Sequence, residues 1–132
     1  MSTIFSKIVK GEIPCYKVAE TDKFLAFLDI FPIQKGHVLT IPKREVDYLF
    51  DLDDVTYREL WSFSKKVARA IEETVPCKRI GVAVLGMEVP HAHIHLVPIN
   101  SEGDLSFSLP KKKFSNEEFE DIAKRISDRV EL

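Results

Sequence analysis

The chain has 132 residues, of which 45% are hydrophobic and 30% charged, a balance typical of one globular domain with an apolar core. The formal net charge of −2 argues against a broad basic surface for nucleic acid or membrane phosphates. No apolar run reaches the thickness of a bilayer, and the N-terminus lacks the apolar core of a signal peptide. Cys15 and Cys77 stand apart without Cys-x-x-Cys spacing, so no disulfide framework is expected. We expect a single cytoplasmic domain, residues 1–132, that binds neither nucleic acid nor membrane.

The first third of the chain predicts a short helix and three strands. Ser2 or Thr3 is suited to cap a helix that ends at about Val9. The β-rich runs are residues 15–19, 24–29 and 37–42. The second run is almost wholly apolar up to Asp29, so both of its faces should be covered. A carboxylate at that place needs partners, and Asp29 either caps the following loop or binds a ligand hydroxyl.

The remainder predicts a long helix, two strands and a last helix. The long helix begins near Asp53 or Asp54 and ends at about Val75, before Pro76, with one apolar stripe at helical spacing. Two strands follow, residues 78–85 and 91–98, and short connections favour antiparallel pairing. A polar stretch with a basic run, Lys111–Lys113, is assigned mainly to solvent, and Ser115 opens the last helix. This order predicts an α+β fold with an antiparallel sheet.

Three of the four histidines occupy alternate positions, His91, His93 and His95, while His37 lies far upstream. Alternate residues of one strand share a face and lie roughly 6.5 Å apart at the backbone. As a strand, this stretch places three imidazoles on one face and Ala92, Ile94 and Leu96 on the other. We therefore expect a row of histidines that faces a cleft.

The histidine row has three interpretations. The first is a set of structural or solvated histidines. The second is a zinc site with Glu88 or His37 as a further ligand. The third is covalent catalysis, in which a neutral imidazole attacks phosphorus and neighbouring rings donate hydrogen bonds or protons. The motif by itself does not separate the last two.

The run His91-Ala92-His93-Ile94-His95-Leu96-Val97 fits the pattern His-φ-His-φ-His-φ-φ, where φ is apolar. It resembles the hydrolase branch of the histidine-triad (HIT) nucleotide-binding family, near its nucleoside phosphoramidases. The segments 4–14 and 24–42 resemble the opening helix and central hairpin of that family. The resemblance covers residues 3–98, whereas the C-terminal extension, residues 99–132, carries no comparable signature.

The resemblance implies a five-stranded antiparallel sheet with a short N-terminal helix, one long central helix and a C-terminal helix. It also implies a homodimer that shares a continuous sheet. His93 would attack the α-phosphorus of a nucleotide, giving a nucleotidyl-histidine that water resolves to a nucleoside monophosphate. His95 and His37 would hydrogen-bond around the phosphate, and His91 would orient the strand.

The resemblance assigns further residues to binding of a purine nucleotide or nucleoside phosphoramidate. Asp29 matches the position that binds ribose hydroxyls. The positions that line the nucleoside pocket are Phe5, Ile8, Phe27 and Ile30. No cofactor is expected.

Some positions depart from the family pattern. Thr3, Ser6 and Glu45 stand where many bacterial relatives have zinc ligands, so no structural metal is expected. Met87 replaces a glutamine expected near the phosphates, and Glu88 stands where a small hydroxyl residue often occurs. A carboxylate repels a polyphosphate, which favours phosphoramidate-like substrates and slow turnover. The alternative is a catalytically weak nucleotide-binding or sensing module.

Overall fold

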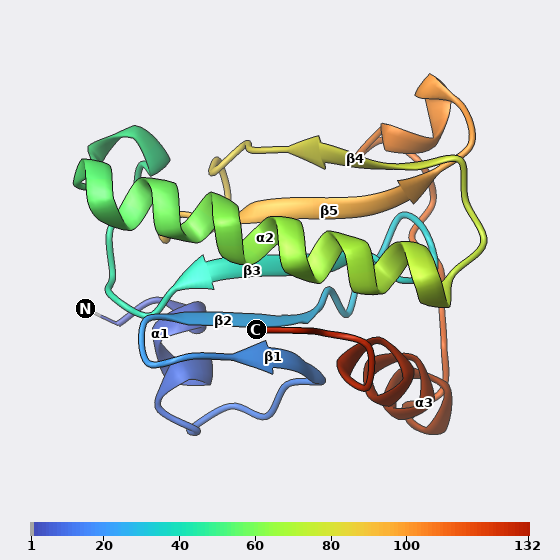
Figure 1. Ribbon diagram of the computed structural model, residues 1–132, viewed down its shortest axis with the longest axis horizontal. Helices are drawn as coiled ribbons and strands as arrows, with labels where there is room; N and C mark the ends of the chain where they lie inside the picture. Colours follow the sequence, from blue (N-terminus) through green and yellow to red (C-terminus); the bar gives the residue numbers. More distant parts are fainter. Residues whose placement is uncertain (1) are drawn as a thin grey trace.

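The computed structural model describes residues 2–132 and contains one five-stranded antiparallel sheet in the order β1-β2-β3-β5-β4 (Figure 1). Its strands are β1 (Lys17–Glu20), β2 (Phe24–Leu28), β3 (Val38–Pro42), β4 (Arg79–Ala83) and β5 (Ile94–Ile99). The helices are α1 (Ile4–Val9), α2 (Asp54–Thr74) and α3 (Asn116–Ser127), with 3₁₀ turns η1 (Leu49–Asp51) and η2 (Glu102–Leu105). This architecture confirms the predicted fold class. Within residues 2–132, no helix is both long and apolar enough to cross a membrane.

One face of the sheet is covered by α2 and α3; in Figure 1, α2 crosses in front of the strands and α3 lies beside the end of β1. Phe24, Ala26 and Leu28 of β2 point to this side and pack with the apolar stripes of the two helices. The stripe of α2 follows the predicted helical spacing, and Asp53 caps the helix by accepting a hydrogen bond from the Thr56 amide. This face is therefore a continuous apolar core.

The opposite face carries a smaller apolar cluster and is covered by α1. Leu25 and Phe27 of β2 pack there with Leu39, Ile41 and Phe5. Every residue of β2 is buried, as predicted for a strand covered on both faces. Because side chains alternate along β3 and β5, the face that holds Leu39 also receives the histidines.

The predicted strand over residues 91–98 is shorter in the structure, because β5 begins at Ile94. His91 and His93 lie just before it, where the Ala92 amide donates to the Val46 carbonyl and the His91 amide to the Val89 carbonyl. These bonds replace the regular strand ladder. The other boundaries shift by one or two residues: the strand predicted at 15–19 is β1, Lys17–Glu20, and His37 directly precedes β3.

Gly36 shapes the turn that leads into His37. Its φ of +86° lies in the left-handed region that glycine adopts readily, and an added Cβ would lie 2.8 Å from Cγ2 of Val75. The backbone at Gly36 therefore approaches the end of α2 more closely than any side chain allows. This approach places His37 at the start of β3.

We predict that Gly36→Ala lowers the free energy of unfolding by about 3 kcal/mol, through left-handed strain and a clash with Val75. Gly11→Ala separates the two causes, since Gly11 has φ +79° with nothing within 4 Å, and should cost about 1 kcal/mol. Gly103→Ala, which meets nothing within 4 Å and needs no positive φ, is the neutral control. Urea unfolding measures all three. Equal losses at Gly36 and Gly11 would contradict the steric argument.

Candidate active site

The four histidines gather on the α1 side of the sheet. The ring centroid of His95 lies 5.0 Å from that of His93 and 5.2 Å from that of His37. Phe5 of α1 links His91 and His93, with its ring centroid 5.9 Å and 5.1 Å from theirs. All four histidines are buried. The structure thus brings together the row that the sequence predicts, although only His95 belongs to a strand.

One hydrogen bond decides the protonation pattern of His93. Its Nδ1 lies 2.7 Å from the carbonyl oxygen of His91. A carbonyl only accepts, so Nδ1 carries the proton, and Nε2 of the neutral ring keeps a free lone pair. His93 therefore presents a nucleophilic nitrogen that is not engaged in this bond.

His37 and His95 form a second hydrogen-bonded chain. The Ile33 amide donates to Nδ1 of His37 over 3.2 Å, so the proton of this ring is on Nε2. That Nε2 lies 2.9 Å from Nδ1 of His95 and donates to it. Neutral His95 must then carry its proton on Nε2. The pair thus offers an N–H donor at His95 beside the lone pair of His93.

His91 is held by α1 and β3. Its Nε2 donates to the Pro42 carbonyl over 2.7 Å, and its Nδ1 lies 3.0 Å from the hydroxyl of Thr3. Ser6 extends this network by donating to Oε1 of Glu45 over 2.5 Å, and the Thr3 amide donates to the same oxygen over 3.0 Å. The carbonyl that orients His93 therefore belongs to a residue whose ring is bonded on both sides.

Burial keeps the rings of His37, His91 and His95 uncharged near neutral pH. It lowers the pKa of His37 to about 3, with a smaller contribution from the positive charge of Lys111. It also lowers the pKa of His95 to about 3, aided by the neighbouring His37 and His93. The pKa of His91 is lowered by burial against the opposing effect of its bond to Pro42. Neutral imidazoles are the form required for nucleophilic attack and for the tautomers above.

Asp29 directly follows β2 beside this cluster and is partly buried. Its Oδ1 accepts a hydrogen bond from the Phe31 amide over 2.8 Å, which is the loop-capping role considered from the sequence. Its Oδ2 lies 3.6 Å from Nε2 of His37. One carboxylate oxygen thus supports the loop while the other faces the histidines.

The other predicted binding residues divide into two groups. Phe5 and Phe27 pack edge to face with ring centroids 5.5 Å apart, and Ile8 packs against the same cluster. Ile30 is exposed and lines a groove of about 720 Å³ with α3. Met87 and Glu88 are exposed in the connection from β4 to β5, with Met87 90% exposed. The structure thus joins the first group to the histidines and leaves the second at the surface.

Two groups of residues deserve comparison with metal sites. The hydroxyls of Thr3 and Ser6 are poor zinc ligands, and the network with Glu45 and His91 already satisfies them, so these residues do not fit a structural zinc ion. Asp29, His37 and His95 place possible ligand atoms within 4.8 Å of one another. However, Nε2 of His37 and Nδ1 of His95 already bond to each other, so these two nitrogens would have to give up that hydrogen bond to coordinate a metal ion.

Sequence analysis missed two residues near the histidines, both from the segment after β5. The ring centroid of Phe107 lies 4.7 Å from that of His95 and 6.1 Å from that of His37. Lys111, which was assigned to solvent, has its ammonium 5.7 Å from the Phe107 ring centroid. A lone aromatic in a polar stretch followed by a basic run was the available signal.

Comparison with known proteins assigns the chain to a family. Residues 10–102 match the HIT domain. The chain belongs to the HIT family. Over 132 residues, this HIT protein is 39% identical to the adenosine 5′-monophosphoramidase hnt1 of Schizosaccharomyces pombe, covering 98% of this chain and 99% of the relative. It is also 38% identical over 100 residues to the adenosine 5′-monophosphoramidase HNT1 of Saccharomyces cerevisiae, covering 75% of this chain and 63% of the relative.

Solved structures share the fold of this HIT protein. A Hit-like protein from Bartonella henselae superposes with a TM-score of 0.84 at 29% identity, covering 98% of this chain and 96% of the other. A zinc-bound histidine triad protein from Mycobacterium smegmatis gives a TM-score of 0.83 at 28% identity, covering 98% and 94%. The resemblance on which the sequence analysis depended is therefore confirmed at the level of family and fold.

We predict that His37 and His95 of this HIT protein stay neutral from pH 8 to pH 5. The unfolded chain takes up protons near pH 6.5, whereas the folded rings resist until about pH 3. Their contribution to stability is therefore complete above pH 6.5 and is lost as the pH falls toward 3. NMR titration of the ring Cε1 protons measures this directly, with a histidine peptide as control. A midpoint near 6.5 for both rings would contradict it.

Proposed function

We propose that this protein hydrolyses nucleoside 5′-phosphoramidates at the α-phosphorus, through a covalent nucleotidyl intermediate on His93. The observation that carries this proposal is the bond from Nδ1 of His93 to the carbonyl of His91, which leaves Nε2 free to attack. Two similar yeast proteins are named adenosine 5′-monophosphoramidases, which supports this branch of chemistry.

In the first step, Nε2 of His93 forms a bond to the α-phosphorus while the phosphorus–nitrogen bond breaks. The leaving nitrogen takes a proton from water. The ring of His93 becomes positively charged, and the carbonyl of His91 stabilises that charge through its bond to Nδ1. The Nε2–H of His95 donates a hydrogen bond to a phosphoryl oxygen.

In the second step, water attacks the phosphorus and the bond to Nε2 of His93 breaks. The proton released by this water neutralises the hydroxide that the first step leaves. The product is a nucleoside monophosphate, and His93 returns to its starting tautomer. The apolar surface of Phe5, Phe27 and Ile8 suits a purine nucleoside, and the free oxygen of Asp29 suits its ribose hydroxyls. The chemistry needs no cofactor.

A catalytically weak nucleotide-binding module is the second candidate. The observation that favours it is the exposed connection after β4, where Met87 and Glu88 replace side chains that would donate to a phosphate. A thioether and a carboxylate accept hydrogen bonds and do not donate them. This candidate predicts nucleotide binding without a covalent adduct.

We predict that His93→Ala abolishes hydrolysis of a fluorogenic adenosine 5′-phosphoramidate and removes a transient mass increase of one nucleoside monophosphate in mass spectrometry. His95→Asn is the matched control, because an amide can still donate to the phosphate, so turnover slows while the adduct forms. Equal rates in the wild type and His93→Ala would exclude His93 as the nucleophile. Nucleotide binding without an adduct in the wild type would favour the binding module.

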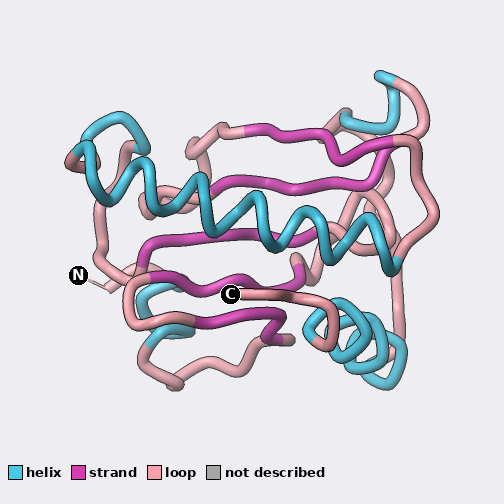
Figure 2. Tube along the Cα trace, in the orientation of Figure 1, coloured by secondary structure: helices cyan, strands magenta, loops and turns pink. Residues whose placement is uncertain are grey.

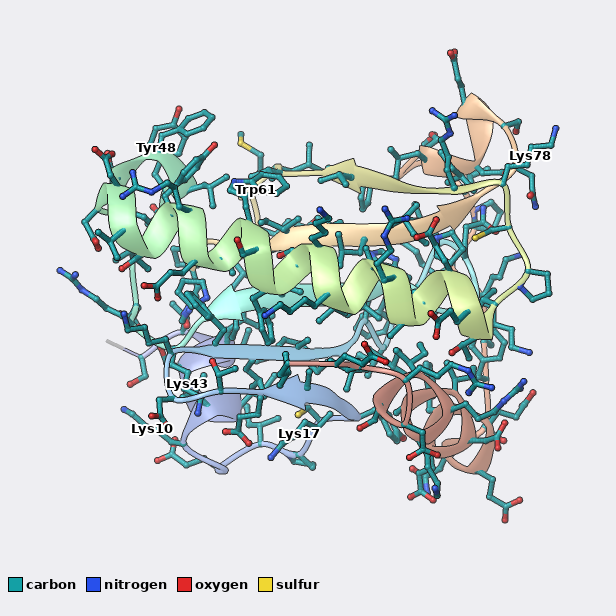
Figure 3. The ribbon with its side chains drawn as sticks, viewed as in Figure 1. Lys10, Lys17, Lys43, Tyr48, Trp61 and Lys78 are labelled. Carbon is teal, nitrogen blue, oxygen red and sulfur yellow. The ribbon has the colours of Figure 1, made fainter. Side chains whose placement is uncertain are left out.

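We also propose that the protein forms a homodimer across the edge of β4. This strand ends the sheet, and it carries exposed apolar side chains: Val82 lies within β4, and Val84 and Leu85 follow it. In the view of Figure 3, Trp61 of α2 projects beside the end of β4, and Tyr48 lies beyond it. Nε1 of Trp61 is buried without a hydrogen-bond partner among residues 2–132. An unpaired strand edge beside apolar side chains is suited to pair with a second copy.

We predict that Val82→Asp converts the dimer to a monomer, because two carboxylates would be buried at the shared edge. Lys17→Asp changes the charge of the opposite edge strand and should leave the dimer intact. Sedimentation equilibrium measures the mass of each variant. A wild type that sediments as a monomer at all concentrations would refute the proposal.

A further inference from the structure

The segment between β5 and α3 folds back toward the histidine site. It descends along one end of the sheet, beside the loop that follows β2 (Figures 1 and 2). The side-chain amide of Gln34 donates to the Asp104 carbonyl over 3.1 Å, and the Lys112 amide donates to the Pro32 carbonyl over 2.8 Å. Two hydrogen bonds thus join this segment to the loop that leads into His37.

Between these two bonds, Phe107 reaches the histidines and Lys111 lies beside Phe107. The half-buried ring of Phe107 lies edge to face on His95, with centroids 4.7 Å apart. The ammonium of Lys111 lies over this ring, 5.7 Å from its centroid, and donates to the Phe107 carbonyl over 3.0 Å. The backbone bond and the cation–π contact both hold the ammonium beside Phe107.

The histidine site has little positive charge to offset an anionic phosphate, and Lys111 is a nearby cation. Because burial keeps His37, His91 and His95 uncharged near neutral pH, these rings do not offset the charge of an anionic phosphate. Asp29 adds negative charge beside His37. The ammonium of Lys111 contacts the Phe107 ring, which in turn packs on His95. Its positive charge also contributes to the lowered pKa of both His37 and His95.

We propose that Lys111, oriented by Phe107, is a phosphate-binding residue that neutralises the α-phosphate of the nucleotide at the histidine site. This inference depends on the proposed function, since it assigns the charge partner of that substrate. Lysine suits the role because its ammonium has three donors on a flexible stem. Phe107 excludes water from one side of the site, which strengthens the attraction.

The substrate class follows from this assignment. A nucleotide that carries a phosphate anion gains from Lys111, whereas an uncharged nucleoside does not. The site should therefore distinguish AMP from adenosine mainly through this one cation. The contribution should weaken as salt rises, because the ammonium is exposed.

The test compares Lys111→Met with Lys113→Met, which changes the net charge equally two residues away. For adenosine 5′-phosphoramidate, Lys111→Met should raise KM about tenfold with little change in kcat, as expected for loss of a hydrogen bond to a charged group. Calorimetric titration should show a similar loss of affinity for AMP and none for adenosine. Lys113→Met should match the wild type, and Lys111→Arg should recover most of the loss.

The outcomes separate this inference from the function on which it depends. If the wild type hydrolyses the phosphoramidate and both methionine variants match it in KM and AMP affinity, the role of Lys111 is refuted. If the wild type does not hydrolyse it but AMP affinity depends on Lys111, the hydrolase proposal fails and the phosphate-binding role stands. If affinity for adenosine falls as much as that for AMP, Lys111 acts through structure and the inference is overturned.

Discussion

The hydrogen bond from Nδ1 of His93 to the carbonyl of His91 is the constraint on which the site depends. A free imidazole exchanges its proton between two nitrogens, and only one arrangement directs a lone pair outward. The His91 carbonyl is itself held in place, because the imidazole ring of His91 is bonded on both sides. Its Nε2 donates to the Pro42 carbonyl, and its Nδ1 faces the Thr3 hydroxyl. The protonation of one nitrogen is thus determined by contacts that extend from α1 to β3.

The two faces of the sheet make this arrangement possible. On one face, α2 and α3 provide a large apolar core that stabilises the fold. On the other, α1 covers only part of the sheet and leaves the histidines beside a small aromatic cluster. Burying four imidazoles costs free energy unless their nitrogens are paired, and the hydrogen bonds among His37, His91 and His95 and the backbone offset that cost.

The segment after β5 brings an aromatic ring and a positive charge to one side of the histidine cluster, since Phe107 packs on His95 and Lys111 lies over Phe107. Its route past the loop at Pro32 brings together residues that are about 70 positions apart in the chain, as in the bond from Gln34 to Asp104. The loop therefore connects Asp29, beside His37, with the C-terminal segment. In the proposed site, the histidines are oriented by α1 and β3, whereas the cation comes from the segment after β5.

Several features of this protein were determined by its sequence alone. Alternating histidines and apolar residues from His91 to Leu96 predicted a row of imidazoles on one face, and the helical stripe of α2 and the buried run of β2 predicted the layers. Motifs within residues 3–98 were sufficient to recognise the family, because they carry local, periodic information. Boundaries were less certain: β5 begins only at Ile94, since bonds to distant backbone groups replace the ladder before it.

Only the tertiary structure decided the tautomers, the directions of the pKa shifts, and the placement of Phe107 against His95 with Lys111 over the Phe107 ring. Each of these depends on groups that are remote in sequence, such as the Ile33 amide, the Pro42 carbonyl and the loop at Pro32. A residue pattern records which side chains are present and how they alternate. Desolvation and hydrogen-bond direction arise only when the folded chain brings those remote groups within a few ångströms of one another.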